Sequence, residues 1–132
     1  MDQAAKHILL VDNDPATRKL FGALLARAGF EVLYAKDGGE GREVARRLQP
    51  DLILLDINMP VMDGWETADR LKSGSNSITA NIPIAFLTNE DLSLEAQKNA
   101  KEFGVADYIQ KGVSSEEFIE RVEKLVNMPA KQ

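Results

Sequence analysis

The sequence predicts an α/β fold, a doubly wound parallel sheet of five strands with five helices distributed over both faces. Two observations support this class. Short apolar runs alternate with amphipathic segments, and the central run, DLILLD at 51–56, is apolar at successive positions. Such alternation is typical of βαβ units, and a strand with apolar residues on both sides is covered on both faces, as in a parallel sheet.

The chain of 132 residues is long enough for one domain, because a domain of this length removes roughly two-thirds of its unfolded surface from water. We expect a single domain over residues 1–132 with its core over about 6–127. A composition of 44% hydrophobic and 28% charged residues is ordinary for folded chains, which argues against disorder.

The net charge of −5, with acids and bases interspersed, offers no basic patch for nucleic acid or for an anionic membrane. We therefore expect no direct binding to either. The absence of cysteine excludes disulfides, thiolate metal sites and cysteine nucleophiles. Because no apolar run approaches about 18 residues and no signal peptide opens the chain, we expect a cytoplasmic location.

The first strand is predicted at HILLV, residues 7–11, and a helix follows it. Asp14 suits the N-cap of this helix, and Pro15 suits its first position, where the N–H that proline lacks would have no partner. Apolar residues then recur at helical spacing until Gly29, which predicts one buried face. These residues are Leu20, Phe21, Leu24, Leu25 and Ala28.

The second strand is predicted at residues 31–35, and the third is the apolar run at 51–56. Between them a short second helix is predicted at about 39–48, because its apolar residues have helical spacing. Val44 and Leu48 are expected to face inward from this helix.

The remaining elements alternate in the same way. A turn with Pro and Gly at 57–64 leads into the third helix, and a polar linker at 73–81 lies within the domain. The last helix begins after Ser114, which has capping-box spacing to Glu117. The predicted ranges are 65–72 for the third helix, 82–87 for the fourth strand, 92–103 for the fourth helix and 106–110 for the fifth strand. The inward residues of the last helix are Phe118, Ile119, Val122 and Leu125.

Polar residues stand at the ends of four predicted strands, namely Asp12 and Asn13, Asp56, Thr88, and Lys111. In a parallel sheet these ends gather in one crevice. Carboxylates held close together repel unless a cation lies among them, and Mg²⁺ prefers carboxylate oxygens together with a phosphate. These residues therefore predict a magnesium and phosphoryl site in the crevice, in which Asp56 attacks phosphorus while Thr88 and Lys111 contact phosphoryl oxygens.

Four stretches resemble the signature sequences of two-component response-regulator receiver domains: ILLVDNDP, DLILLDINMPVMDG, IPIAFLT and DYIQKG. They occur in order and at suitable spacing, and the resemblance covers nearly the entire chain. It implies a flavodoxin-like domain with strand order 2-1-3-4-5. It also implies a phosphoprotein that accepts a phosphoryl group from a histidine kinase or a histidine phosphotransfer protein.

The resemblance implies roles for individual residues. The implied phosphoacceptor is Asp56, and the implied phosphoryl contacts are Thr88 and Lys111. The implied metal ligands are Asp12, Asn13, Asp56 and the backbone carbonyl of Asn58. The implied switch residues are Thr88 and Tyr108. Asn58 and Glu90 resemble residues of chemotaxis-type regulators. Switching is expected to remodel the face made by the fourth helix, fifth strand and fifth helix, which an output protein or fused effector domain would bind.

The sequence departs from the family pattern at the metal site, where the second of two adjacent acids is Asn13. An amide oxygen can still bind Mg²⁺, but the lost negative charge predicts a lower affinity. Asp14 does not replace that acid, because its position before Pro15 favours helix capping. Asn89 stands where a small residue is usual, which would slow phosphotransfer by narrowing access to Asp56.

Gly112 is a further departure, since it stands where proline is usual. We expect a trans peptide bond before Gly112, because a non-proline cis bond costs about 2.5–4 kcal/mol. Since the family's proline often carries a cis bond, the reach of Lys111 is expected to differ from the usual one.

Two other functions compete with the phosphorylated switch. In the first, the protein is a receiver-like interaction module, poorly phosphorylated or unphosphorylated because of Asn13. In the second, DND after an apolar strand marks a hydrolase of the haloacid dehalogenase type, which fits badly because the threonine is at 17 rather than 16 and a cap domain is missing. We expect no classical enzyme, only self-catalysed phosphotransfer and dephosphorylation. The chain ends soon after the last helix, so we expect either a stand-alone regulator or a fragment.

Overall fold

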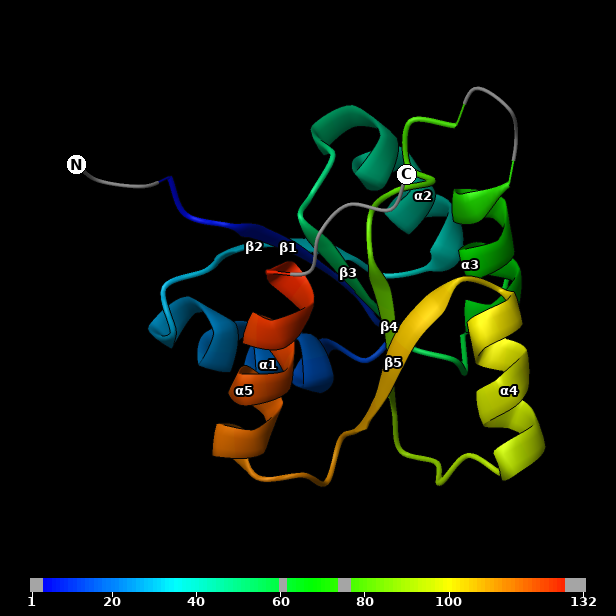
Figure 1. Ribbon diagram of the computed structural model, residues 1–132. Coiled ribbons are helices and arrows are strands. Elements are labelled where there is room, and N and C mark those ends of the chain that lie inside the picture. The colour runs from blue at the N-terminus through cyan, green and yellow to red at the C-terminus, as the bar shows by residue number, and fades with distance from the viewer. Residues whose placement is uncertain (1–3, 60–61, 74–76, 128–132) are drawn as a thin grey trace.

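The computed structural model describes residues 4–59, 62–73 and 77–127 (Figure 1). Within these ranges the chain forms one parallel five-stranded sheet in the order β2-β1-β3-β4-β5, which confirms the predicted topology. The strands are β1 His7–Val11, β2 Glu31–Ala35, β3 Leu52–Leu55, β4 Ile84–Thr88 and β5 Val105–Gln110. The helices are α1 Pro15–Arg27, α2 Gly38–Leu48, α3 Gly64–Lys72, α4 Leu94–Glu102 and α5 Ser115–Val126.

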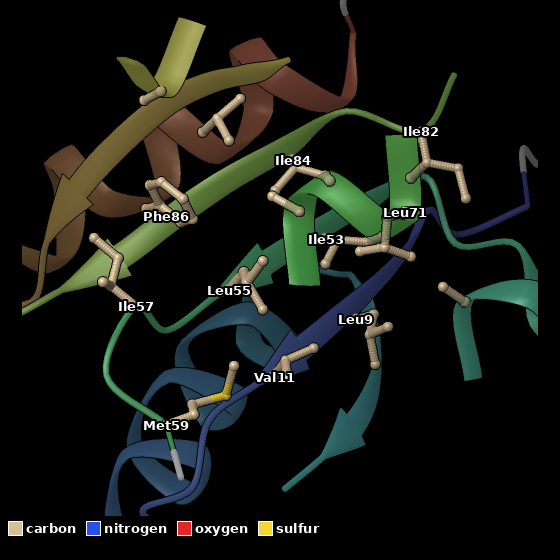
Figure 2. Close-up of a cluster of buried hydrophobic side chains, with 14 of the residues drawn as sticks. Leu9, Val11, Ile53, Leu55, Ile57, Met59, Leu71, Ile82, Ile84 and Phe86 are labelled. Carbon is tan, nitrogen blue, oxygen red and sulfur yellow. The ribbon is translucent and has the colours of Figure 1, made fainter. Parts of the chain in front are cut away.

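Helices cover both faces of the sheet, with α1 and α5 on one side and α2, α3 and α4 on the other (Figure 1). Successive residues of a strand point to opposite faces, so each inner strand serves both cores. In β1, Leu9 and Val11 pack toward α2 and α3, whereas Ile8 and Leu10 pack toward α1 and α5. Figure 2 shows the first of these cores, where side chains of β1, β3 and β4 meet Leu71 of α3.

The two predicted helix caps are confirmed. The Asp14 carboxylate accepts a hydrogen bond from the backbone N–H of Ala16 at 3.0 Å, with Pro15 opening α1. The Ser114 hydroxyl accepts one from the N–H of Glu117 at 3.1 Å. These side chains satisfy N–H groups that the first helical turn leaves without partners, so they define where α1 and α5 begin.

The expected burial is wrong at two leucines. Leu48 is 52% exposed although it is on the same helical face as Gly41 and Ala45, because it is the last residue of α2. Leu20 is 58% exposed, since it lies one residue, or about 100° of helix rotation, before the buried Phe21. Ala28, at the end of the same predicted stripe, is exposed as well.

Part of the polar linker predicted at 73–81 is hydrogen-bonded to the end of α3. Thr79 is buried, and its hydroxyl donates to the carbonyl oxygen of Leu71 at 2.6 Å. Residues 74–76 of this linker and residues 60–61 of the predicted turn lie outside the described residues. Among the helices that the structure describes, none combines the length and the apolar composition needed to cross a membrane.

Candidate functional site

The carboxyl edge of the sheet brings the predicted site residues together. Asp12 directly follows β1, Asp56 follows β3, Thr88 ends β4 and Lys111 follows β5. Backbone hydrogen bonds continue the sheet beyond the strands, from Asp56 N to the carbonyl of Val11 at 2.9 Å and from Lys111 N to that of Thr88 at 2.7 Å. The backbone at the site is therefore held by the same ladder that holds the sheet.

Lys111 lies between the two carboxylates. Its Nζ is 2.8 Å from Oδ2 of Asp12 and 3.7 Å from Oδ1 of Asp56. Asp12 is 1% and Asp56 7% exposed, so both carboxylates are largely removed from water. One buried ammonium thus faces two buried carboxylates, which leaves the cluster with an excess of negative charge.

The two oxygens of Asp12 have different surroundings. Oδ1 accepts a hydrogen bond from the N–H of Asp14 at 2.9 Å. Oδ2 makes the ion pair with Lys111, but without hydrogen-bond geometry, and among the described residues it is the one buried side-chain oxygen or nitrogen left without a hydrogen-bond partner. A buried oxygen of this kind is suited to bind a cation.

The ionisation of Asp56 is opposed by its surroundings. Burial raises the pKa of Asp56, and the nearby charge of Asp12 raises it further. The ammonium of Lys111 and a backbone hydrogen bond from Asn58 N, at 3.4 Å to Oδ1, act in the opposite direction without overcoming the first two causes. An added cation would therefore stabilise the ionised carboxylate that a phosphoryl transfer requires.

The donor set for Mg²⁺ fits, but it is short of acids. Within residues 4–59, 62–73 and 77–127, no group of three or more His, Cys, Asp or Glu side chains is arranged to hold a metal. The site offers Asp12 and Asp56, and Asn13 is exposed beside them. A further protein ligand must come from the Asn13 amide or from a backbone carbonyl such as that of Asn58.

Asp14 has the capping role that was predicted for it. Besides the N–H of Ala16, its carboxylate accepts a hydrogen bond from the Thr17 hydroxyl at 3.0 Å. These two hydrogen bonds lower the pKa of Asp14. Since these donors already occupy its oxygens, Asp14 is not a candidate replacement for the acid that Asn13 lacks.

The two predicted switch residues lie on neighbouring strands. Thr88 is fully buried, and its hydroxyl oxygen accepts a hydrogen bond from the N–H of Glu90 at 3.0 Å. Tyr108 is half-buried and packs against the core beneath α2, α3 and α4, opposite Phe86 of β4 in the sheet register. Thr88 thus lies at the charged edge of the sheet, whereas Tyr108 is part of the packing between β5 and the core.

The loops that follow β3 and β4 meet through a side-chain hydrogen bond. The side-chain amide of Asn58, between β3 and α3, donates to Oε1 of Glu90, between β4 and α4, at 2.7 Å. Asn89 is exposed next to this contact. None of the described peptide bonds is cis, so the bond before Gly112 is trans, as predicted.

Sequence reasoning missed two arginines that organise the surroundings of the site. Arg18 of α1 donates from Nη1 to the backbone carbonyl of Asp12 at 2.5 Å. Arg121 of α5 donates from Nη2 to Oδ1 of Asp107 at 2.7 Å and to the carbonyl of Tyr108 at 2.5 Å. The local sequence gives no signal for these contacts, because each arginine contacts a residue outside its own helix.

Comparison with known proteins agrees with this geometry. A family model described as the response regulator receiver domain matches residues 8–123. The chain is 31% identical over 115 residues to Protein PilH of Pseudomonas aeruginosa, covering 87% of this chain and 93% of PilH. It is 37% identical over 119 residues to the DNA-binding dual master transcriptional regulator RpaA of Synechocystis, covering 90% of this chain but 48% of RpaA. The chain thus spans about half the length of several curated relatives.

Solved structures show the same fold. Chemotaxis protein CheY4 of Vibrio cholerae superposes with a TM-score of 0.85 at 30% identity, covering 92% of this chain and 99% of CheY4. The receiver domain of sensor histidine kinase PA1611 from Pseudomonas aeruginosa was solved with a magnesium ion in its active-site cleft. It superposes with a TM-score of 0.82 at 27% identity, covering 95% of this chain and 100% of the PA1611 domain. With the family model, the relatives and the charged sheet edge in agreement, this chain belongs to the response-regulator receiver domain family.

Proposed function

We infer that this receiver domain accepts a phosphoryl group on Asp56 from a histidine kinase or a histidine phosphotransfer protein. The observation that carries this proposal is the cluster at the sheet edge, where the largely buried Asp56 carboxylate lies beside Asp12 and 3.7 Å from the Lys111 ammonium. Phosphoryl transfer requires positioning and charge neutralisation more than covalent chemistry, and these residues supply both.

The proposed step is an in-line displacement. An oxygen of Asp56 bonds to phosphorus as the bond from phosphorus to the donor's imidazole nitrogen breaks, and the nitrogen keeps the electron pair. Lys111 and the Thr88 hydroxyl contact phosphoryl oxygens and neutralise their charge. Asp12, Asp56, the Asn13 amide and the Asn58 carbonyl would hold Mg²⁺, which supplies further neutralisation of charge when bound.

The proposed output is a shift of Thr88 and Tyr108 that remodels the face formed by α4, β5 and α5. Thr88 is buried at the site, and Tyr108 lies on the neighbouring strand β5. A movement of β4 at Thr88 would therefore shift β5, which is part of that face. A partner needs only a different affinity for the two states to read them. That partner would be an output protein or a fused effector domain, and the cytoplasm is the expected location.

The test is modification by acetyl phosphate in the presence of Mg²⁺, measured by mass spectrometry of the intact protein and its peptides. We expect one phosphoryl group on the peptide that carries Asp56, with none when Mg²⁺ is omitted. Asp56→Ala should abolish the modification, whereas Asp12→Ala should slow it without moving it. Modification that persists in Asp56→Ala, or that is located on Asp12, would contradict the proposal.

A second candidate function is a receiver-like interaction module that is weakly phosphorylated or not at all. It is favoured by Asn13 and by the absence of a three-acid cluster within the described ranges. Beryllofluoride with Mg²⁺ separates the two functions. Binding by the wild-type protein supports the switch, whereas binding only by Asn13→Asp supports the interaction module. Receiver domains are generally not classical enzymes, and neither function requires turnover of a separate substrate.

A further inference from the structure

A groove of about 580 Å³ lies between α2 and the carboxyl-terminal end of α3, which are neighbours on the same face of the sheet (Figure 1). One side is formed by Arg42 and Arg46 of α2, and Arg70 of α3 adds a third guanidinium. The short segment 77–79 completes the lining. This segment leads to the amino end of β4, so the groove extends toward the sheet edge opposite Asp56.

The charge of this groove is opposite to that of the molecule. Three arginines and one carboxylate, Glu43, line it, whereas the whole chain carries a net charge of −5. Arg46 pairs with Glu43 at 2.9 Å and Arg70 with Glu66 at 3.0 Å, both as exposed pairs within one helix. Exposed pairs of this kind contribute little to stability, so either arginine can exchange its partner at low cost.

Arg42 differs from the other two arginines of the groove. It is exposed, and it makes no ion pair or side-chain hydrogen bond with any residue that the structure describes. One guanidinium fork in the groove is therefore available without breaking an existing contact. Such forks bind carboxylates through two parallel hydrogen bonds.

An apolar side chain is held at the same groove. The hydroxyls of Ser77 and Thr79 donate to the carbonyl oxygen of Leu71 at 3.1 and 2.6 Å, which ties the segment to the last turn of α3. Ile78, between them, is 53% exposed and lines the groove. A ligand in the groove thus meets positive charge together with an exposed aliphatic side chain.

We propose that this basic groove, defined by Arg42, Arg46, Arg70 and Ile78, binds an extended acidic segment of a partner protein that carries an apolar residue among its acids. Arg42 and Arg46 are one helical turn apart, with about 5–6 Å between their Cβ atoms. Alternate residues of an extended chain are separated by about 6.6 Å, so two acids at such positions can each meet one arginine. The apolar residue contacts Ile78.

An acidic segment fits this groove better than a small phosphate compound. Sites for small molecules enclose most of the ligand surface. Here Arg46 and Arg70 keep 64% and 48% of their side chains exposed, so the groove is open along its length. An extended chain can occupy an open groove, because its remaining surface is covered by the rest of the partner.

The experiment measures binding of a fluorescein-labelled, end-blocked peptide of sequence Glu-Leu-Glu-Ser-Glu to the full chain by fluorescence anisotropy. We expect saturable binding that weakens as salt is added, and no binding of the analogue with Gln in place of each Glu. Arg42→Gln with Arg46→Gln should weaken binding at least tenfold, and Ile78→Ser should weaken it severalfold. Thermal unfolding of each variant verifies that the domain still folds.

The matched control is Arg47→Gln, which removes the same charge from the exposed surface of α2 but does not line the groove. The proposal is overturned if this variant loses as much affinity as the protein with both Arg42→Gln and Arg46→Gln, if the Gln peptide binds equally well, or if neither peptide binds. Inorganic tripolyphosphate is the second probe. Tighter binding of tripolyphosphate than of the acidic peptide, with the same dependence on Arg42 and Arg46, would replace the acidic segment by a small polyanion.

Discussion

At the Asp56 carboxylate, burial and charge oppose one another. Removal from water and the charge of Asp12 disfavour ionisation, and the single ammonium of Lys111 compensates only in part. The folded protein therefore binds a proton at Asp56 more tightly than the unfolded chain does. Stability linked to Asp56 is present at low pH and falls as the pH rises from the ordinary value of 3.8 through the raised pKa.

This sign predicts that Asp56→Asn increases the free energy of unfolding of the metal-free protein at pH 7, because the substitution removes a carboxylate whose ionisation is disfavoured. The increase should shrink as the pH falls below the raised pKa, where the wild-type carboxyl is also neutral. Urea unfolding in the presence of EDTA at several pH values measures this difference. Asp91→Asn, at an exposed position, is the control, and an equal increase there would contradict the explanation.

A second prediction at the scale of single residues concerns Asn13. We expect Asn13→Asp to bind Mg²⁺ roughly tenfold more tightly than the wild type, because an added charge next to a divalent cation contributes about 1–2 kcal/mol in a solvated site. Titration calorimetry measures both affinities. Asn81→Asp, an exposed substitution of the same kind before β4, should leave the affinity unchanged. No gain in Asn13→Asp would refute the assigned ligand position.

At the scale of elements, α2 shows how a helix whose buried residues are small approaches the sheet. A Cβ atom added at Gly41 would come within 2.9 Å of Cγ2 of Val11, the last residue of β1. Gly41 and Ala45 therefore let the α2 backbone lie close to the strands. Val44 is half-buried and packs against the core, as periodicity predicts, whereas Leu48 is exposed because it is the last residue of α2.

We predict that Gly41→Ala destabilises the domain by about 1–3 kcal/mol, since the added methyl group forces α2 away from a stiff β-branched side chain. Gly39→Ala is the matched control. It lies in the same helix, and an added Cβ there meets only the Asp37 carboxylate at 3.6 Å, so better helix propensity should stabilise the protein by up to about 1 kcal/mol. Urea unfolding of both variants measures the contrast, and equal effects would show that packing against Val11 does not matter.

At the scale of the whole molecule, the sheet assembles a site from segments far apart in the sequence. Asp12, Asp56 and Lys111 follow three different strands, and both faces of the sheet are covered by helices that hold those strands in place. A group that contacts all three side chains therefore links the strands at their carboxyl edge. Binding at this edge must stabilise the folded molecule as a unit.

This linkage predicts that beryllofluoride with Mg²⁺ raises the temperature of thermal unfolding of the wild-type protein. At a free concentration one hundred times the dissociation constant, the stabilisation should be about 2.7 kcal/mol. Asp56→Asn replaces the carboxylate that would bind beryllium by a neutral amide and should show no increase. Fluoride alone and Mg²⁺ alone serve as controls. An equal increase for Asp56→Asn would place the binding site elsewhere.

The sequence alone determined the elements of the fold and the residues of the site, because both depend on local patterns. The alternation of apolar runs predicts the five strands and five helices, and Asp14 and Ser114 mark helix starts through hydrogen bonds to residues two or three positions away. Because parallel strands end at a common edge, the polar residues that terminate them predict a shared site. The order of the strands was accessible only through the resemblance to a known family.

Tertiary structure alone decided the contacts that span elements. The Lys111 ammonium reaches both carboxylates, Arg18 contacts the carbonyl of Asp12, and the arginines of α2 and α3 meet across one groove. The exposure of Leu48 was likewise decided in the folded structure, where it is the last residue of α2. These features depend on distances between residues of different elements, which periodicity and capping patterns do not encode.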